Sequence, residues 1–259
     1  MSHSITQKKD GSVVTVLLDN PDKLNALNLA SWDELARVMT ALSEDDEIRC
    51  VVIRGVGERA FCAGADISEL PVKRGDAAGA RQYGAVTDAA MEAITECRHP
   101  TLAAIRGPCT GGGLEIACAC DIRIAGASAR FGVPINRLGH VLGHMEMKLV
   151  LAAAGPELLL EMLLEARIID AEEALCRGLV GRVVPDGELD ATVAAAAERI
   201  AEGAPLSNRT TKKFLRRLSS PAPLSEAELD EVNTVCDSDD YAEGLRAFLA
   251  KEKPDFKGK

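Results

Sequence analysis

The sequence predicts an α/β fold in which strands alternate with helices, followed by a helical C-terminal portion. In the first half, short β-branched or apolar runs end at turn-forming residues and are separated by segments with a helical period. From about residue 147 onward, helical periods follow one another with Pro or Gly between them. This alternation is typical of βαβ units whose helices pack on a sheet.

The first expected strand is residues 13–18, a β-branched run that stops at the turn-prone residues 19–22. A helical period follows from Ser31, and its apolar face comprises Trp32, Leu35, Val38, Met39 and Leu42. Ser31 can cap this helix, because Glu34 stands three residues later, as in a capping box.

Further strands are expected at residues 50–53, 100–105 and 121–125, which are apolar runs that lead into glycine-containing turns. A helix is expected between the second and third strands, at residues 85–96. The expected C-terminal helices cover residues 170–177, 189–201, 207–218 and 225–236. No internal repeat, low-complexity tract or linker interrupts the pattern.

The overall charge argues against nucleic acid as a partner. The chain has 259 residues and a net charge of −10, whereas binding to phosphate backbones requires a basic surface. A local basic patch can still bind an anionic cofactor. The longest apolar stretch, residues 149–164, is broken by Gly155 and Pro156, so we expect no membrane span.

The cysteine pattern favours a reducing compartment. The N-terminus has no apolar segment typical of a secretory signal. Of the eight cysteines, Cys118 and Cys120 lie two apart, but no second pair stands at zinc-binding spacing. We therefore expect reduced, mostly buried thiols in a cytoplasmic protein. No His, Asp, Glu or Cys cluster has metal-ligand spacing, so no metal is expected.

Two glycine-containing turns, residues 60–66 and 107–115, are the segments most suggestive of chemistry. Small residues let a backbone approach a ligand closely, and three glycines that open a helix place its positive dipole end there. Two such turns side by side would form an oxyanion hole. Close packing of a helix would explain the triple glycine equally well. Neither a G-x-G-x-x-G motif nor a Walker lysine is present.

Around the first turn the sequence reads Phe61-Cys62-Ala63-Gly64-Ala65-Asp66-Ile67, and around the second it reads Gly111-Gly112-Gly113-Leu114-Glu115-Ile116-Ala117, followed by Cys120-Asp121. These strings closely resemble the crotonase superfamily, which includes the enoyl-CoA hydratases and isomerases. The resemblance also covers residues 20–27, the segment Phe131-Gly132-Val133-Pro134 and residues 171–180, and so extends over nearly the whole chain.

The resemblance implies a spiral of ββα units over residues 1–200 and a C-terminal helical region over residues 201–259. This helical region drives trimerisation in the family, so we expect a homotrimer or a dimer of trimers. The implied substrate is an acyl-CoA thioester. Coenzyme A (CoA) would then enter as part of the substrate, and no separate cofactor is expected.

The resemblance places the two donors of an oxyanion hole on the N–H groups of Ala65 and Gly112. Asp66 would cap or position the segment after the hole. Phe256 and Lys257 resemble the aromatic residue and lysine that contact the CoA of a neighbouring subunit in the family. The residues expected to contact the substrate or its CoA moiety are Leu24, Ala26, Ala63, Gly64, Asp66, Ile67, Gly111, Ile135, Leu138, Phe256 and Lys257.

Glu115 matches the first of the two glutamates that hydratases of this family use for proton transfer. A helix dipole and a partly apolar pocket would tune its pKa. A structural alternative is that a glutamate is simply favoured in a first helical turn. The position of the second glutamate, twenty residues later, is occupied by Ile135, which cannot transfer a proton.

Several nearby groups could replace the missing glutamate. Asn136 and Arg137 adjoin the position, but neither is a base at neutral pH. The titratable candidates are Tyr83, His140, His144 and Glu146.

Four functions remain open: hydration of an enoyl thioester, double-bond isomerisation, another crotonase reaction such as decarboxylation or thioester hydrolysis, and non-catalytic acyl-CoA binding. The presence of Glu115 beside the glycine turns favours an enzyme. We expect an enoyl-CoA hydratase/isomerase-like enzyme that stabilises a thioester enolate and uses Glu115 as acid or base.

Overall fold

The computed structural model describes residues 4–259, and within them the main sheet has six strands in the order β1-β2-β3-β4-β6-β9. β1 is antiparallel to β2, and all other neighbours are parallel. The strands are β1 (Ser4–Asp10), β2 (Val13–Asp19), β3 (Cys50–Gly55), β4 (Thr101–Ile105), β6 (Ile122–Gly126) and β9 (Arg182–Val184). A smaller sheet in the same residues consists of β5 (Pro108–Thr110), β7 (Arg130–Gly132) and β8 (Ile168–Asp170).

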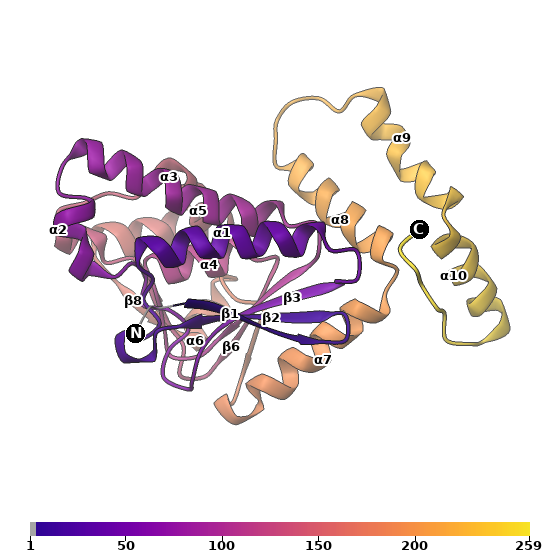
Figure 1. Ribbon diagram of the computed structural model, residues 1–259, viewed down its shortest axis with the longest axis horizontal. Helices are drawn as coiled ribbons and strands as arrows, with labels where there is room; N and C mark the ends of the chain where they lie inside the picture. The colour runs from indigo at the N-terminus through magenta and orange to yellow at the C-terminus, as the bar shows by residue number, and fades with distance from the viewer. Residues whose placement is uncertain (1–3) are drawn as a thin grey trace.

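Helices cover both faces of the main sheet (Figure 1). The α-helices are α1 (Leu29–Glu44), α2 (Leu70–Lys73), α3 (Ala77–Glu96), α4 (Gly112–Ala119), α5 (His144–Leu164), α6 (Ala171–Cys176), α7 (Leu189–Glu202), α8 (Pro205–Leu218), α9 (Glu226–Thr234) and α10 (Asp239–Ala250). Short 3₁₀ turns are η1 (Pro21–Lys23), η2 (Ile67–Glu69), η3 (Ile135–Leu138), η4 (Asp186–Glu188) and η5 (Val235–Asp237).

Strand β3 shows how the sheet separates two hydrophobic cores. Because successive side chains of a strand point to opposite faces, Val51 and Ile53 join the large core that includes α1, α3 and α4. Cys50 and Val52 face the other way, into a smaller core with α7. A strand buried on both faces has a continuous apolar sequence, which explains why the first half contains such runs.

The structure confirms the predicted α/β class and the strands expected at residues 13–18, 50–53, 100–105 and 121–125. The predicted cap of the first long helix is wrong. α1 begins at Leu29, and its N-cap is Asn28, whose side chain accepts the N–H of Ser31 at 2.9 Å. Glu34 instead accepts the N–H of Ile5 at 3.0 Å and so ties α1 to the sheet edge.

The C-terminal half is helical, as predicted, but it also contains two strands, β8 and β9. These strands, like β5 and β7, have three residues each, which is too short for a period-2 pattern to be recognised. The sequence analysis also missed α10. α5 is interrupted at Gly155, which has a positive φ of 75° ahead of Pro156.

Helices α8, α9 and α10 extend from one side of the sheet (Figure 1). The proposed boundary after residue 200 falls within α7, and the division into core and helical region stays a prediction. Among residues 4–259, no helix is both long enough and apolar enough to cross a bilayer.

Candidate active site

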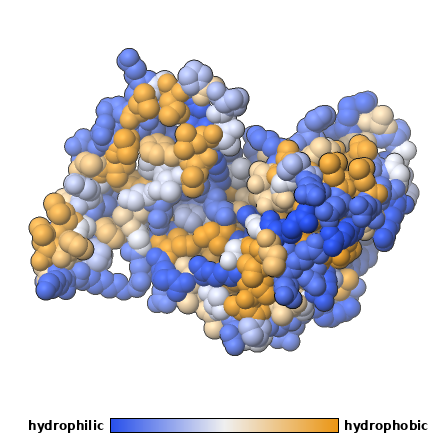
Figure 2. Space-filling model, turned by 180° about the vertical axis from the view of Figure 1, so that it is seen from behind, coloured by the Kyte–Doolittle hydropathy of each residue, from blue (hydrophilic) through white to orange (hydrophobic). Residues whose placement is uncertain are grey.

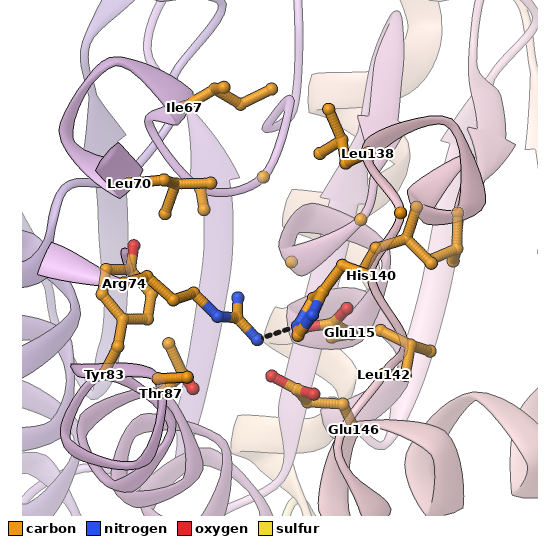
Figure 3. A pocket seen from close by; sticks show the side chains of 18 of the residues that line it. Ile67, Leu70, Arg74, Tyr83, Thr87, Glu115, Leu138, His140, Leu142 and Glu146 are labelled. Atoms are coloured by element: carbon orange, nitrogen blue, oxygen red, sulfur yellow. Dashed lines mark hydrogen bonds between the residues drawn. The ribbon is translucent and has the colours of Figure 1, made fainter. Parts of the chain in front are cut away.

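A cavity of about 660 Å³ lies between α2 and α3 on one side and the segment from η3 to the start of α5 on the other. Figure 3 shows side chains from both walls pointing into it. The structure brings nine of the residues predicted from the sequence to this cavity: Ala63, Gly64, Ala65, Ile67, Gly111, Gly112, Glu115, Ile135 and Leu138. Both glycine-containing turns therefore line one pocket.

Backbone hydrogen bonds hold the two turns side by side. The N–H of Cys62 donates to the carbonyl of Pro108 at 3.1 Å, and the N–H of Thr110 donates to the carbonyl of Cys62 at the same distance. Cys62 and Cys109 thus pair like residues of parallel strands. This pairing fixes the position of the first turn against the start of α4.

Gly64 makes the closest approach between the turns possible. Its φ is +100°, a conformation that side-chain-bearing residues rarely adopt. A Cβ atom at this position would lie 2.9 Å from the carbonyl oxygen of Thr110 and 3.1 Å from the nitrogen of Gly112. The glycine is therefore required both by the backbone conformation and by the contact.

The N–H groups of Ala65 and Gly112 donate no hydrogen bond within residues 4–259. The neighbours of Ala65 pair with Leu27: the carbonyl of Gly64 accepts the Leu27 N–H, and the N–H of Asp66 donates to the Leu27 carbonyl, both at 2.8 Å. Because the backbone is extended there, the Ala65 N–H points away from Leu27. Gly112 is the first residue of α4, whose N–H has no partner inside the helix.

Asp66 caps η2, as the sequence analysis expected. Its carboxylate accepts the N–H of Ser68 at 3.1 Å and pairs with the ammonium of Lys23 at 2.6 Å. Burial opposes ionisation, but the hydrogen bonds from Lys23 and Ser68 outweigh it and lower the pKa of Asp66. The side chain lies outside the cavity and supports the segment that carries Ala65.

Leu24 and Ala26 also lie outside the cavity, in the turn behind it. The carbonyl of Leu24 accepts the N–H of Ala63 at 3.0 Å, and Ala26 is 6% exposed. Leu24 has a left-handed φ of 53°, which directs the chain back toward the first glycine turn. These residues support the turn from behind in the isolated chain.

Phe256 and Lys257 do not approach the cavity of their own chain. The carbonyl of Phe256 accepts a hydrogen bond from Arg49, and the N–H of Lys257 donates to Asp240 at 2.6 Å. The ammonium of Lys257 pairs with Asp255 at 2.6 Å. The tail is thereby held against α10, and its expected contact with CoA of a neighbouring subunit stays a prediction.

Glu115 lies in the first turn of α4 with 5% of its surface exposed. Its carboxyl group accepts no hydrogen bond from the described residues 4–259. Burial raises the pKa of Glu115 well above its ordinary value of 4.5, the nearby Glu146 raises it further, and Arg74 partly offsets both effects. Glu115 is therefore a buried carboxylic acid that faces the cavity.

Ile135 lines the cavity, and so does the second nearby glutamate, Glu146. Glu146 is 8% exposed and occupies the third position of α5, where its Oε2 accepts the N–H of Gly143 at 2.5 Å. The electrostatic effect of Glu146 on Glu115 shows that the two carboxyl groups are close. Figure 3 shows both projecting into the same space.

The other candidates for the second proton-transfer group are placed differently. His140 lines the cavity and is hydrogen-bonded to Arg74, whereas His144 is exposed and lies outside it. The hydroxyl of Tyr83 donates to Glu69 at 3.2 Å, and burial, followed by the charge of Glu69, raises the pKa of Tyr83.

Asn136 and Arg137 are exposed and hydrogen-bond the carbonyls of Leu164 and Ala166. Arg74 was not predicted from the sequence, because one basic residue in a polar segment carries no recognisable signal. No group of three or more metal-binding side chains occurs in the part of the chain that the structure describes.

The chain belongs to the enoyl-CoA hydratase/isomerase family, whose sequence model matches residues 8–259. The fold is therefore the crotonase spiral, and the protein is an acyl-CoA-processing enzyme of that superfamily. A solved structure of an enoyl-CoA hydratase/carnithine racemase from Magnetospirillum magneticum is 49% identical, with a TM-score of 0.97 and coverage of 98% of this chain and 96% of that one.

Two curated relatives are similar over nearly their whole lengths. The short-chain-enoyl-CoA hydratase of Clostridium acetobutylicum is 33% identical, over 97% of this chain and 96% of the relative. The carnitinyl-CoA dehydratase of Proteus mirabilis is 33% identical over 100% of both chains.

Proposed function

We propose that the protein hydrates 2-enoyl-CoA thioesters through an enolate held by the N–H groups of Ala65 and Gly112. The observation that carries the proposal is that these two unbonded donors line the same cavity as the buried carboxyl group of Glu115. The relatives described above support hydration over isomerisation, because both are named for the addition or removal of water.

In the proposed reaction the thioester carbonyl oxygen binds between the two N–H groups. Addition of water to C3 moves the double-bond electrons onto that oxygen, and the donors stabilise the enolate that forms. One such donor contributes roughly 3 kcal/mol to lowering the barrier. The dipole of α4, whose N-terminus begins at Gly112, adds to this stabilisation.

Glu115 protonates C2 of the enolate. Burial raises its pKa well above 4.5 and favours the protonated carboxyl group, so it can act as an acid at a higher pH than an ordinary carboxyl group. The carboxyl group is not held by another hydrogen bond in residues 4–259, so its proton is available to a substrate.

Glu146 takes up the proton that the attacking water loses, in place of the glutamate that Ile135 replaces. It is buried, lines the cavity and is electrostatically coupled to Glu115. In each cycle the hydroxyl of water bonds to C3, a proton passes to Glu146, and Glu115 gives its proton to C2. A proton returned from Glu146 to Glu115 through solvent restores the starting state.

The proposed reaction uses no separate cofactor, because CoA is the thiol part of the thioester substrate. A homotrimer or a dimer of trimers is supported by exposed apolar side chains on α8–α10, where a partner would cover them. Figure 2 shows apolar residues on this part of the molecule, at the left of the view. They include Leu215, Leu229, Leu245, Phe248 and Leu249.

The test is mass-spectrometric product analysis with acyl-CoA substrates that vary in length, unsaturation and branching. A product heavier by one water, formed from a 2-enoyl-CoA, is the expected result. Conserved mass with a shifted double bond, loss of CO₂ or release of free CoA would replace hydration by another crotonase reaction. If none of the acyl-CoA compounds is converted, the result would favour non-catalytic binding.

A further inference from the structure

Arg74, at the C-terminus of α2, is the only arginine or lysine among the described residues that line the cavity. Its guanidinium points across the cavity toward His140 and donates a hydrogen bond to the imidazole (Figure 3). The same guanidinium lies 5.5 Å from the centre of the Tyr83 ring. Its Nε is buried and has no hydrogen-bond partner in residues 4–259.

His140 does not compensate the charge of Arg74. Burial and the neighbouring guanidinium both lower the pKa of His140, so the imidazole is neutral and accepts the hydrogen bond from Arg74. A cation that is partly removed from water is most stable when a negative charge or strong acceptors surround it. Among residues 4–259, the hydrogen-bond partner of the guanidinium supplies an acceptor and no charge.

No carboxyl group forms an ion pair with Arg74 within residues 4–259, although several are near. The carboxylate of Glu69 accepts hydrogen bonds from the Leu29 N–H at 2.6 Å and from the Tyr83 hydroxyl. Asp76 caps α3 by accepting the N–H of Gly79 at 2.8 Å.

The two glutamates inside the cavity are also engaged or uncharged. Glu146 accepts the Gly143 N–H, and burial raises the pKa of Glu115 well above 4.5, which favours its uncharged form. Within residues 4–259, the guanidinium thus has no direct anionic partner.

We propose that Arg74 binds a carboxylate on the acyl group, so that the preferred substrates are CoA monothioesters of dicarboxylic acids. This inference rests on the proposed function, because it concerns the acyl group in the same cavity. The guanidinium presents N–H groups in a fixed fork that fits a carboxylate with two hydrogen bonds. Leu70 and Leu142 line the same space and suit the methylene part of such an acyl chain.

In the complex, the substrate carboxylate replaces the His140 imidazole as the partner of Arg74. The exchange replaces a neutral acceptor by a charged one, which strengthens the hydrogen bonds. An acyl chain that ends in a methyl group leaves the hydrogen bond between Arg74 and His140 in place. Its binding is not strengthened by the positive charge of Arg74. Selectivity for a terminal carboxylate follows from this difference.

The experiment compares calorimetric binding of glutaryl-CoA and pentanoyl-CoA, which have five acyl carbons each and differ in the terminal carboxylate. Neither has a double bond, so neither can be hydrated. The wild-type protein is expected to bind glutaryl-CoA more tightly. Arg74→Met should weaken glutaryl-CoA binding roughly 10- to 100-fold and change pentanoyl-CoA binding by no more than about threefold. Methionine keeps the apolar stem of the side chain.

Arg137→Met is the matched control, because Arg137 is an exposed arginine of the neighbouring segment outside the cavity. It should leave both affinities unchanged. Equal binding of the two thioesters by the wild-type protein, or an equal loss of both in Arg74→Met, would overturn the inference and leave Arg74 a structural link to His140 and Tyr83. The wild-type comparison decides even if the variant fails to fold.

The two proposals fail separately. A preference for glutaryl-CoA without hydration of any 2-enoyl-CoA would contradict the proposed function and support the role of Arg74. Hydration of 2-pentenoyl-CoA by a protein with no preference for glutaryl-CoA would support the proposed function and contradict the role of Arg74.

Discussion

The nitrogen of Gly112 would lie only 3.1 Å from a Cβ atom on Gly64, so the two turns touch backbone to backbone. The free N–H groups of Ala65 and Gly112 lie next to this contact, and both residues line the same cavity. The proposed oxyanion hole therefore depends on a residue that supplies neither donor. A side chain at position 64 would separate the turns without removing either N–H.

Gly64→Ala should lower kcat for a 2-enoyl-CoA roughly 100- to 1000-fold, about the effect of losing one oxyanion-hole donor. The added methyl group would clash with Thr110 and Gly112 and strain a φ of +100°. Steady-state kinetics measure the loss. Gly84→Ala in α3 is the control, since its Cβ meets no atom within 4 Å. Equal activity of the Gly64 variant would contradict the role of the contact.

Glu115→Gln should reduce kcat roughly 100- to 10,000-fold, because the amide keeps the shape of the side chain but cannot protonate C2. Binding of a saturated acyl-CoA should survive, since the two backbone donors remain. Kinetics and calorimetry on the same variant separate the two effects. Wild-type turnover in this variant would remove Glu115 from the mechanism.

Glu146→Gln should lower kcat by a similar factor, roughly 100-fold or more, without loss of the helix cap. Glutamine can still accept the Gly143 N–H, so the substitution isolates proton transfer from the structural role of the side chain. A smaller effect than tenfold would argue that another group takes the water's proton.

Ile135→Glu in the Glu146→Gln background should restore part of the lost hydration activity. Position 135 lines the cavity, so a carboxylate there would return the glutamate that the family normally has. Ile135→Gln in the same background is the control, because it has the same length but no proton to exchange. Rescue by both variants would show that packing, and not proton transfer, had been repaired.

The buried Glu115 predicts a pH-dependent stability difference between the wild-type protein and Glu115→Gln. The folded-state pKa of Glu115 is raised well above 4.5 by burial, so the unfolded chain loses this proton first as the pH rises. The free energy of unfolding of the wild type should therefore fall relative to the variant above pH 4.5, until Glu115 ionises in the folded protein. Urea unfolding across this range measures the difference, and a constant value would contradict the raised pKa.

The sequence predicted the elements that carry long patterns. The β-branched run of β2 and the apolar run of β3 each extend over enough residues to be recognised, and so does the helical period of α1. Three-residue strands such as β7 are too short to show a hydrophobic pattern. β7 forms because it pairs with β8, which comes from a distant part of the same chain. The cap of α1 was misplaced because Asn28 and Ser31 are both good N-cap residues, and tertiary contacts of Glu34 decide between them.

The same distinction holds for the site. The glycine turns and Glu115 are local motifs, so they could be found without a structure. Glu146 was only one of several candidates, because its approach to Glu115 depends on the packing of α4 against α5. Arg74 has no motif, and its position opposite His140 results from the folding of two distant segments.

The central claim is that a thioester enolate forms between Ala65 and Gly112 and is protonated at C2 by Glu115. NMR of the product formed from crotonyl-CoA in deuterated water tests it most directly. The expected product is a 3-hydroxyacyl-CoA with one deuterium at C2, and its formation should be strongly slowed in Glu115→Gln. A product without deuterium at C2, or the same rate of deuterium incorporation in the variant, would contradict the claim.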